Sequence, residues 1–318
     1  MSPAPLRLGT RRSPMAMVQA GLVARAITAQ TGYDVELVGV ESSGDRSPAP
    51  LTQIGGTGVF VSSLRTSLLA GEVDIAVHSL KDLPTGPAAG IALAAVPARD
   101  DPRDALVTRD GAKLADLRPG ATVGTGSPRR AAQLLLLRPD VHPVPVRGNA
   151  GTRLAKVENG DLDALVLGYA GLSRIGRLDA VAQVFEPDEM VPAAGQGALA
   201  VECSQAREGL VALLGAIDDP VSRAATTAER SMLGALQGGC AAPVGAYAGG
   251  MDVLRLDGLV VATDGGMVLR GSANGALAAA EELGRQVAAD LLSRGAARCM
   301  AVSGTTGSGG HLTSGDDD

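Results

Sequence analysis

The sequence predicts an α/β protein with two doubly wound domains, followed by a small third α/β domain. Short apolar runs alternate with segments of helical period through most of the chain, which is typical of parallel sheets covered by helices. A strand–Ser-Pro–helix pattern occurs twice, at residues 10–17 and 124–131, and favours two similar domains. After residue 220 a long helical segment precedes two strands and another helix, which indicates a smaller domain with an antiparallel sheet.

The first domain begins with a strand at residues 6–10 and a helix directly after it. Ser13 is a suitable N-cap, and Pro14 fits the first helical position because no N–H is needed there. One helical face carries apolar side chains, at Met15, Val18, Leu22 and Ala26. Later elements of this domain are predicted at residues 34–40 (strand), 59–70 (helix) and 74–77 (strand).

The second domain repeats this layout. Ser127 is its N-cap and Pro128 its first helical position. The predicted elements are strands at residues 121–124 and 163–167 and helices at 129–137 and 152–158.

The third domain begins with a predicted helix at residues 224–237, which leads into Gly238-Gly239-Cys240. Strands at 253–261 and 267–272 and a helix at 277–293 follow. We expect domain 1 at residues 1–97, completed by 198–216, domain 2 at 103–192, domain 3 at 220–303, and a disordered tail at 304–318.

Composition excludes several classes of function. A net charge of −6, no Trp, two Phe and three Tyr disfavour nucleic-acid binding, which needs a basic face and stacking platforms. Three dispersed cysteines and three histidines without ligand spacing predict neither a disulfide framework nor a metal site. The sequence has no long apolar run and no apolar signal segment at its start, so we expect a cytoplasmic protein that does not enter a membrane.

Arginines occur repeatedly at predicted strand ends and helix starts, where free N–H groups and the helix dipole also favour an anion. In a doubly wound fold these positions meet at the crevice along the carboxyl edge of the sheet. An exposed arginine beside a turn would explain any single case. The repetition predicts a ligand with several carboxylates or phosphates, bound by Arg11, Arg12, Arg129, Arg130, Arg147 and Arg153.

Two further positions could carry chemistry. Lys81 and Asp82 follow a buried-type strand at the same edge, where a carboxylate could stabilise a developing positive charge; a surface ion pair is the alternative. Cys240 follows two glycines in a flexible loop, which favours a reactive thiol; a buried core cysteine is the alternative.

Nine stretches, in order, resemble the porphobilinogen deaminase family over about residues 6 to 300. They are TRRSPMA, GTGVFV, DIAVHSLKDLP, DPRDALV, VGTGSPRRAAQL, VRGNAGTRLAKVENGDLDALVLGYAGLSRIG, VPAAGQGALAVE, TTAERSMLGALQGGC and APVGAYA. The resemblance implies two domains of the type-II periplasmic-binding-protein kind plus a small α/β domain. It also implies a dipyrromethane cofactor joined by a thioether to Cys240, and a monomeric transferase.

The implied reaction is the head-to-tail polymerisation of four porphobilinogen molecules to hydroxymethylbilane, with release of ammonia, in haem biosynthesis. Asp82 matches the family's catalytic aspartate, which stabilises a cationic intermediate. Matching cofactor-binding positions are Ser13, Lys81, Asp82, Thr125, Ser127, Arg129, Arg130 and Arg147. Matching substrate-binding positions are Arg11, Arg147, Arg153, Arg174 and Gln196.

The chain departs from the family pattern at Thr57, Gly126, Pro128 and Gln237, where many relatives have Lys, Ser, Leu and Glu. For this chain the resemblance therefore does not extend to one contact of a lid loop and to some side-chain hydrogen bonds. A non-catalytic two-domain protein that binds a polycarboxylate is the alternative function, but it predicts no role for Cys240. A ligand-sensing domain of a transcription regulator would need a DNA-binding module, and no segment is left over for one.

Overall fold

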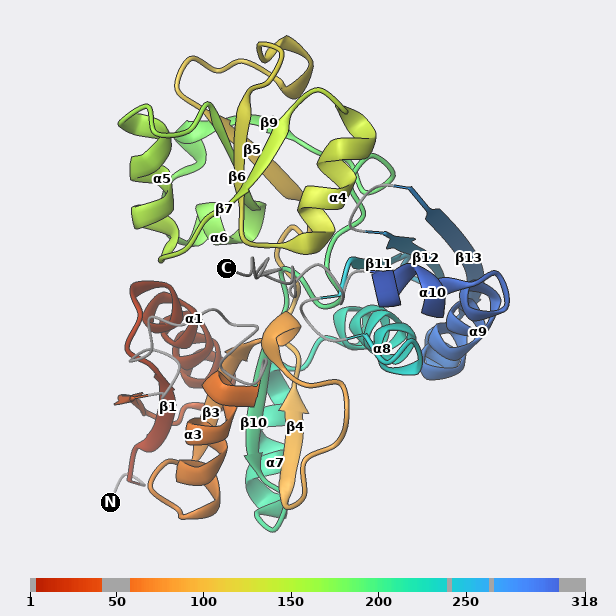
Figure 1. Cartoon of the computed structure of the whole chain (residues 1–318). Helices are drawn as coiled ribbons and strands as arrows, with labels where there is room; N and C mark the ends of the chain where they lie inside the picture. Colours follow the sequence, from red (N-terminus) through yellow and green to blue (C-terminus); the bar gives the residue numbers. More distant parts are fainter. Residues whose placement is uncertain (1–3, 42–57, 239–241, 263–265, 303–318) are drawn as a thin grey trace, which may run out of the picture.

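The computed structural model describes residues 4–41, 58–238, 242–262 and 266–302, which form three α/β units (Figure 1). The first unit contains a five-stranded sheet of order β2-β1-β3-β10-β4. Its strands are β1 (Leu6–Arg11), β2 (Val35–Val40), β3 (Ile75–Ser79), β4 (Ile91–Ala95) and β10 (Leu199–Ser204). Its helices are α1 (Pro14–Thr31), α3 (Gly58–Leu69) and α7 (Glu208–Leu214), and a 3-10 turn, η1 (Leu80–Asp82), follows β3.

The second unit has the same kind of sheet, of order β7-β6-β8-β5-β9. The strands are β5 (Asp104–Thr108), β6 (Thr122–Thr125), β7 (His142–Pro145), β8 (Ala164–Gly168) and β9 (Val181–Val184). The helices are α4 (Pro128–Leu137), α5 (Ala150–Glu158) and α6 (Tyr169–Arg174).

The expectation of purely parallel sheets is wrong for one strand in each unit. β10 runs antiparallel to β3 and β4, and β5 runs antiparallel to β8 and β9. The reason is the path of the chain. β5 and β10 each begin where a linker arrives from the other unit, so they start at the edge where the parallel strands end. Asp104 at the start of β5 accordingly pairs with Gly168 at the end of β8.

The third unit is an antiparallel sheet, β11 (Val244–Gly249), β12 (Val253–Val261) and β13 (Val268–Ala276), packed on α8 (Pro220–Ala235), α9 (Ala280–Ser293) and α10 (Ala296–Val302). α8 starts earlier than predicted because Asp219 caps it and Pro220 occupies its first position. The fold thus has two similar α/β units and a smaller α/β unit, as the sequence predicts.

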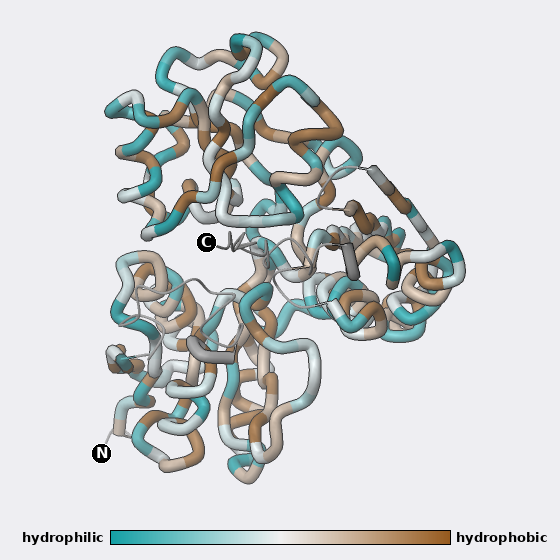
Figure 2. Tube along the Cα trace, in the orientation of Figure 1, coloured by the Kyte–Doolittle hydropathy of each residue, from teal (hydrophilic) through white to brown (hydrophobic). Residues whose placement is uncertain are grey.

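The cores lie between sheets and helices. Leu8, Ile27 and Ile75 are among the side chains buried in the first unit, and Leu106, Leu134 and Phe185 belong to a core of the second. Figure 2 shows hydrophobic stretches along the strands of both units, interrupted by hydrophilic turns. Among the described residues, no helix is long and apolar enough to cross a membrane.

Two linkers, residues 96–103 and 185–198, join the first two units. They pass so close together that a Cβ on Gly197 would lie 2.3 Å from the carbonyl oxygen of Asp100. Gly197 also has a φ of +88°, so only glycine suits this crossing. Arg174 covers it, donating to Asp100 Oδ2 (2.8 Å) and to the carbonyl of Gly197 (2.6 Å).

Candidate active site

Both Ser-Pro motifs form the helix starts that the sequence predicts. Ser13 Oγ accepts a hydrogen bond from the backbone N–H of Ala16 (3.3 Å), and Ser127 Oγ accepts one from that of Arg130 (3.4 Å). In each helix proline follows the cap at the first position. The two starts follow β1 and β6, so each lies at the carboxyl end of a parallel strand.

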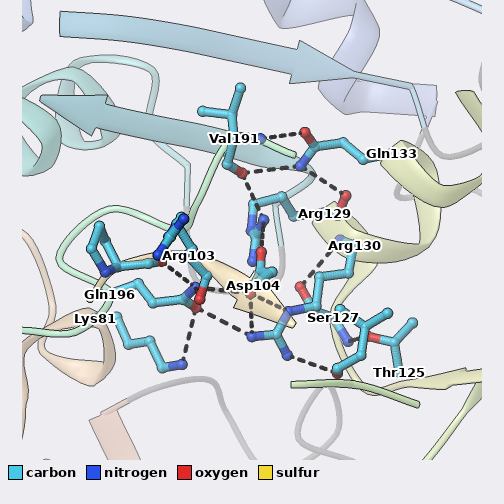
Figure 3. Close-up of polar contacts among 12 residues, drawn as sticks. Lys81, Arg103, Asp104, Thr125, Ser127, Arg129, Arg130, Gln133, Val191 and Gln196 are labelled. Atoms are coloured by element: carbon cyan, nitrogen blue, oxygen red, sulfur yellow. Dashed lines mark hydrogen bonds and ion pairs between the residues drawn. The ribbon is translucent and has the colours of Figure 1, made fainter. Parts of the chain in front are cut away.

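The centre of the site is Asp104, the first residue of β5, whose side chain is fully buried. Arg129 Nη1 lies 2.8 Å from its Oδ2, and Arg130 Nε donates to its Oδ1 at 2.9 Å. Gln196 Nε2 also donates to Oδ1, at 2.8 Å (Figure 3). Burial alone would raise the pKa of the Asp104 carboxyl, but the two guanidinium charges and these hydrogen bonds hold it far below its usual value.

Lys81 joins this cluster from the first unit. Its Nζ lies 3.3 Å from Gln196 Oε1, which also accepts from Arg130 Nη2 at 3.2 Å (Figure 3). Burial and the charge of Arg130 lower the pKa of Lys81 to about 8, although Asp82 and Asp104 oppose the shift. Gln196 therefore links predicted residues from both units around one carboxylate.

The arginines of α4 point inward. Arg129 is 3% exposed and also donates to the carbonyl of Val191 (2.6 Å), and Arg130 donates to that of Val166 (3.3 Å). Both side chains are thus engaged with the protein itself. Asp104 was not singled out from the sequence. The available signal was an acidic residue that opens the apolar run Asp104–Thr108.

Arg153 on α5 is a fourth cation near this cluster. Its Nε is buried without a hydrogen-bond partner among the described residues. Burial, followed by the charge of Arg130, lowers the pKa of Arg153. A Cβ on Gly126 would lie 4.0 Å from both terminal nitrogens of Arg153 and 2.9 Å from the carbonyl oxygen of Val146. The glycine at this departure from the family pattern therefore avoids a steric clash.

The structure distributes the other predicted residues unevenly. Arg11 lies half-buried at the end of β1, and Arg147 is exposed just after β7. Arg174 is turned toward the linkers, as described above. Thr125 is buried, and its Oγ1 accepts from the backbone N–H of Ser127 (3.2 Å).

Asp82 ends the 3-10 turn that follows β3 and is partly buried. The Asp82 carboxylate lies close enough to Lys81 for its charge to raise the pKa of that side chain, against the effect of burial. The turn itself is anchored because Leu80 donates its N–H to the carbonyl of Ala198 (3.0 Å).

Cys240 and Thr57 lie outside the described residues. The chain reaches the cysteine segment through α8 and Gln237, whose φ of 54° is unusual for a residue other than glycine. Cys203 and Cys299 are buried, and Cys299 Sγ donates to the carbonyl of Met267 (3.6 Å). No group of His, Cys, Asp and Glu within the described ranges is arranged to hold a metal ion.

The fold and this cluster define a two-unit α/β protein that presents concentrated positive charge at the junction of its sheets. Two family profiles match the chain, "Porphobilinogen deaminase, dipyromethane cofactor binding domain" over residues 6–212 and "Porphobilinogen deaminase, C-terminal domain" over 224–293. The chain belongs to the porphobilinogen deaminase family. It is therefore an enzyme of tetrapyrrole biosynthesis with a domain for the dipyrromethane cofactor.

Relatives match over nearly the whole length. The porphobilinogen deaminase of Thermobifida fusca is 60% identical over 311 residues, covering 95% of this chain and 97% of that protein. Porphobilinogen deaminase 1 of Streptomyces coelicolor is 52% identical, with 93% and 97% covered. Among solved structures, the periplasmic VFT2 domain of Bordetella pertussis BvgS is 19% identical with a TM-score of 0.41, covering 67% of this chain and 86% of that one.

Proposed function

We propose that the protein joins four porphobilinogen molecules head to tail into hydroxymethylbilane, with release of ammonia, and that Asp82 is its catalytic carboxylate. The observation that carries this proposal is the charge balance at the junction of the two units. One buried carboxylate, Asp104, is surrounded by three cations: Arg129, Arg130 and Lys81. The remaining positive charge favours a ligand with several carboxylates, and porphobilinogen carries two.

The residues present fit a dipyrromethane, which carries an acetate and a propionate on each ring. The Nε of Arg153 is buried without a hydrogen-bond partner among the described residues, and burial together with the charge of Arg130 lowers the pKa of this side chain, so a ligand carboxylate would be favoured beside it. We assign binding of the cofactor to Ser13, Lys81, Asp82, Thr125, Ser127, Arg129, Arg130 and Arg147, and its attachment to Cys240. When bound, the dipyrromethane supplies the free pyrrole α-carbon to which the first substrate is joined.

The protein's own residues then have separable tasks. The Asp82 carboxylate would accept a hydrogen bond from the pyrrole N–H of a substrate. It would also stabilise the positive charge that develops when ammonia leaves. Arg11, Arg147 and Arg153 would bind the substrate's carboxylates. Besides its assigned place at the cofactor, Arg129 would hold Asp104, and Arg174 would hold the linkers, because donors of each are engaged there. Gln196 would keep Lys81 and Arg130 at a fixed separation.

We further propose a monomer that acts as a transferase in the cytoplasm and binds no nucleic acid. The free, buried thiol of Cys203 suits a reducing compartment. The net charge of −6 opposes binding to a polyanion.

The test combines mass and turnover. Intact-mass measurement of the purified protein should show an added dipyrromethane, which Cys240→Ser should abolish. Asp82→Asn should keep the added mass and the unfolding midpoint but lose nearly all bilane formation. A protein that binds porphobilinogen yet carries no adduct and forms no bilane would contradict the proposal. Full turnover by Asp82→Asn would contradict the role of Asp82 alone.

A further inference from the structure

Arg230 on α8 contacts the turn that carries Asp82. Its Nη1 donates to the carbonyl oxygens of Leu83 (3.0 Å) and Leu80 (3.3 Å), and its Nη2 donates to that of Pro84 (2.7 Å). Lys81 and Asp82 are the two residues between these carbonyls. One guanidinium therefore holds the backbone on both sides of the carboxylate.

This geometry suits an arginine. A planar guanidinium presents several donors in a fixed fork, whereas a lysine ammonium is a single point that cannot satisfy three separated carbonyls in the same way. The helix also approaches the turn closely here, because a Cβ on Gly234, one turn beyond Arg230, would lie 3.3 Å from Thr85 Oγ1.

α8 is itself held in place by Glu229, the residue before Arg230. Glu229 is fully buried and accepts hydrogen bonds from Arg99 Nη1 (2.7 Å) and from the backbone N–H groups of Gly195 (2.7 Å) and Ala248 (2.8 Å). These partners belong to the two linkers and to β11. Arg230 thus extends from a helix that is fixed against both linkers and against β11.

The same helix leads into the segment that contains Cys240. α8 ends at Ala235, five residues before the cysteine. α8 is therefore linked to both chemical groups of the proposed reaction. The residue that carries the thiol, Cys240, follows the helix in the sequence, and Arg230 binds the turn that carries the Asp82 carboxylate.

We propose that Arg230 is a positioning residue that fixes the turn carrying the Asp82 carboxylate against α8, the helix that precedes Cys240 in the sequence. This inference rests on the proposed function of Asp82. Three neutral carbonyls bind the guanidinium directly, so Arg230 can place the turn without forming an ion pair with Asp82. Misplacing a catalytic group by about 1 Å costs on the order of 10²-fold in rate.

The experiment compares Arg230→Gln with Arg223→Gln in the cofactor-loaded enzyme. Arg223 is a matched control because it lies on the same helix and also donates to two carbonyls, those of Leu93 (3.3 Å) and Ala94 (3.0 Å), away from the Asp82 turn. Arg230→Gln should lower kcat on the order of 10²-fold with little change in KM and with the cofactor mass retained. Arg223→Gln should leave kcat within about twofold.

Hydrogen exchange gives a readout that does not depend on turnover. The amides of residues 80–85 should exchange faster in Arg230→Gln than in Arg223→Gln. If Arg230→Gln does not fold, Arg230→Lys serves instead. It should show a smaller loss of kcat, and the amides of residues 80–85 should again exchange faster than in Arg223→Gln. Unchanged exchange and unchanged kcat in whichever variant folds would overturn the proposal.

A double-mutant cycle separates this inference from the function on which it rests. If Arg230 acts through Asp82, adding Arg230→Gln to Asp82→Asn should lower the residual rate by less than about twofold. A full second loss in the double variant would overturn the positioning role while leaving Asp82 catalytic. Full activity of Asp82→Asn alone would instead defeat the proposed function.

Discussion

The two Ser-Pro helix starts place their arginines in opposite environments. In the first unit Arg11 and Arg12 precede the cap, and Arg12 remains 64% exposed, pairing with Glu41 at 2.7 Å. In the second unit Arg129 and Arg130 follow the proline into the first turn of α4, where both are buried against Asp104. Relative to the serine cap, a shift of four positions therefore separates the arginine pair of the first unit from the buried pair of the second.

The difference teaches that a shared backbone motif does not imply shared electrostatics. Cations in the first turn of a helix oppose its dipole, and burial adds a desolvation cost. The second unit offsets both by placing Asp104 at the start of β5. Its positive charge is thereby fixed in position, whereas Arg12 of the first unit stays exposed to solvent beside Glu41.

The largest expected effect is on the buried counter-ion. Asp104→Asn should lower the free energy of unfolding by about 3–5 kcal/mol, because it leaves two buried guanidinium groups without a carboxylate. Glu41→Gln, which removes the equivalent counter-ion in the first unit, should cost less than about 1 kcal/mol. Urea unfolding of the two variants measures both values, and similar losses would show that burial does not separate the two pairs.

The same comparison can be extended to pH. The pKa of Asp104 is depressed in the folded protein from 3.8, so the stability it adds is complete well above that pH and is lost as the pH falls below it. The difference in unfolding free energy between the wild type and Asp104→Asn should shrink by about 1.4 kcal/mol for each pH unit below 3.8. Glu202, whose pKa is lowered to about 2, is present in both proteins, so its contribution to the difference in unfolding free energy cancels. A difference that stays constant from pH 5 to pH 3 would contradict this account.

The smallest effects concern the caps, where the two units should behave alike. Ser13→Ala and Ser127→Ala should each cost about 1 kcal/mol of unfolding free energy, since each serine satisfies one helix N–H. Ser→Gly at the same positions should cost only a few tenths of a kcal/mol and serves as the control, because glycine is a tolerated cap without a hydroxyl. Thermal unfolding of the four variants, with cofactor loading checked by mass, would detect an unequal loss.

Much of the fold was predictable because its signals are local. Ser13, Ser127, Pro14 and Pro128 identify the helix starts from residue type alone, and the structure confirms them. The buried strands β3 and β8 were predicted from uninterrupted apolar runs. The antiparallel placement of β5 and β10 was not, because strand direction depends on where the linkers enter the sheet.

The site was predicted less completely, for a related reason. Residue type and position indicated Lys81, Arg129 and Arg130, but their partner Asp104 lies more than twenty residues from each in sequence. Glu229 was missed although it lies on the apolar face of α8, four residues after Ala225 and three before Met232, where a charged residue requires a buried partner. Pairings between distant segments follow from the tertiary fold and have no signature within a single stretch of sequence.

The position of β10 has a consequence for synthesis on the ribosome. Residues 6–95 emerge first, but their sheet has an empty slot between β3 and β4 until residues 199–204 have been made. The second sheet uses only residues 104–184, so it can be completed earlier. The second unit should therefore complete its sheet before the first, whose sheet is held open until residue 204 has been made.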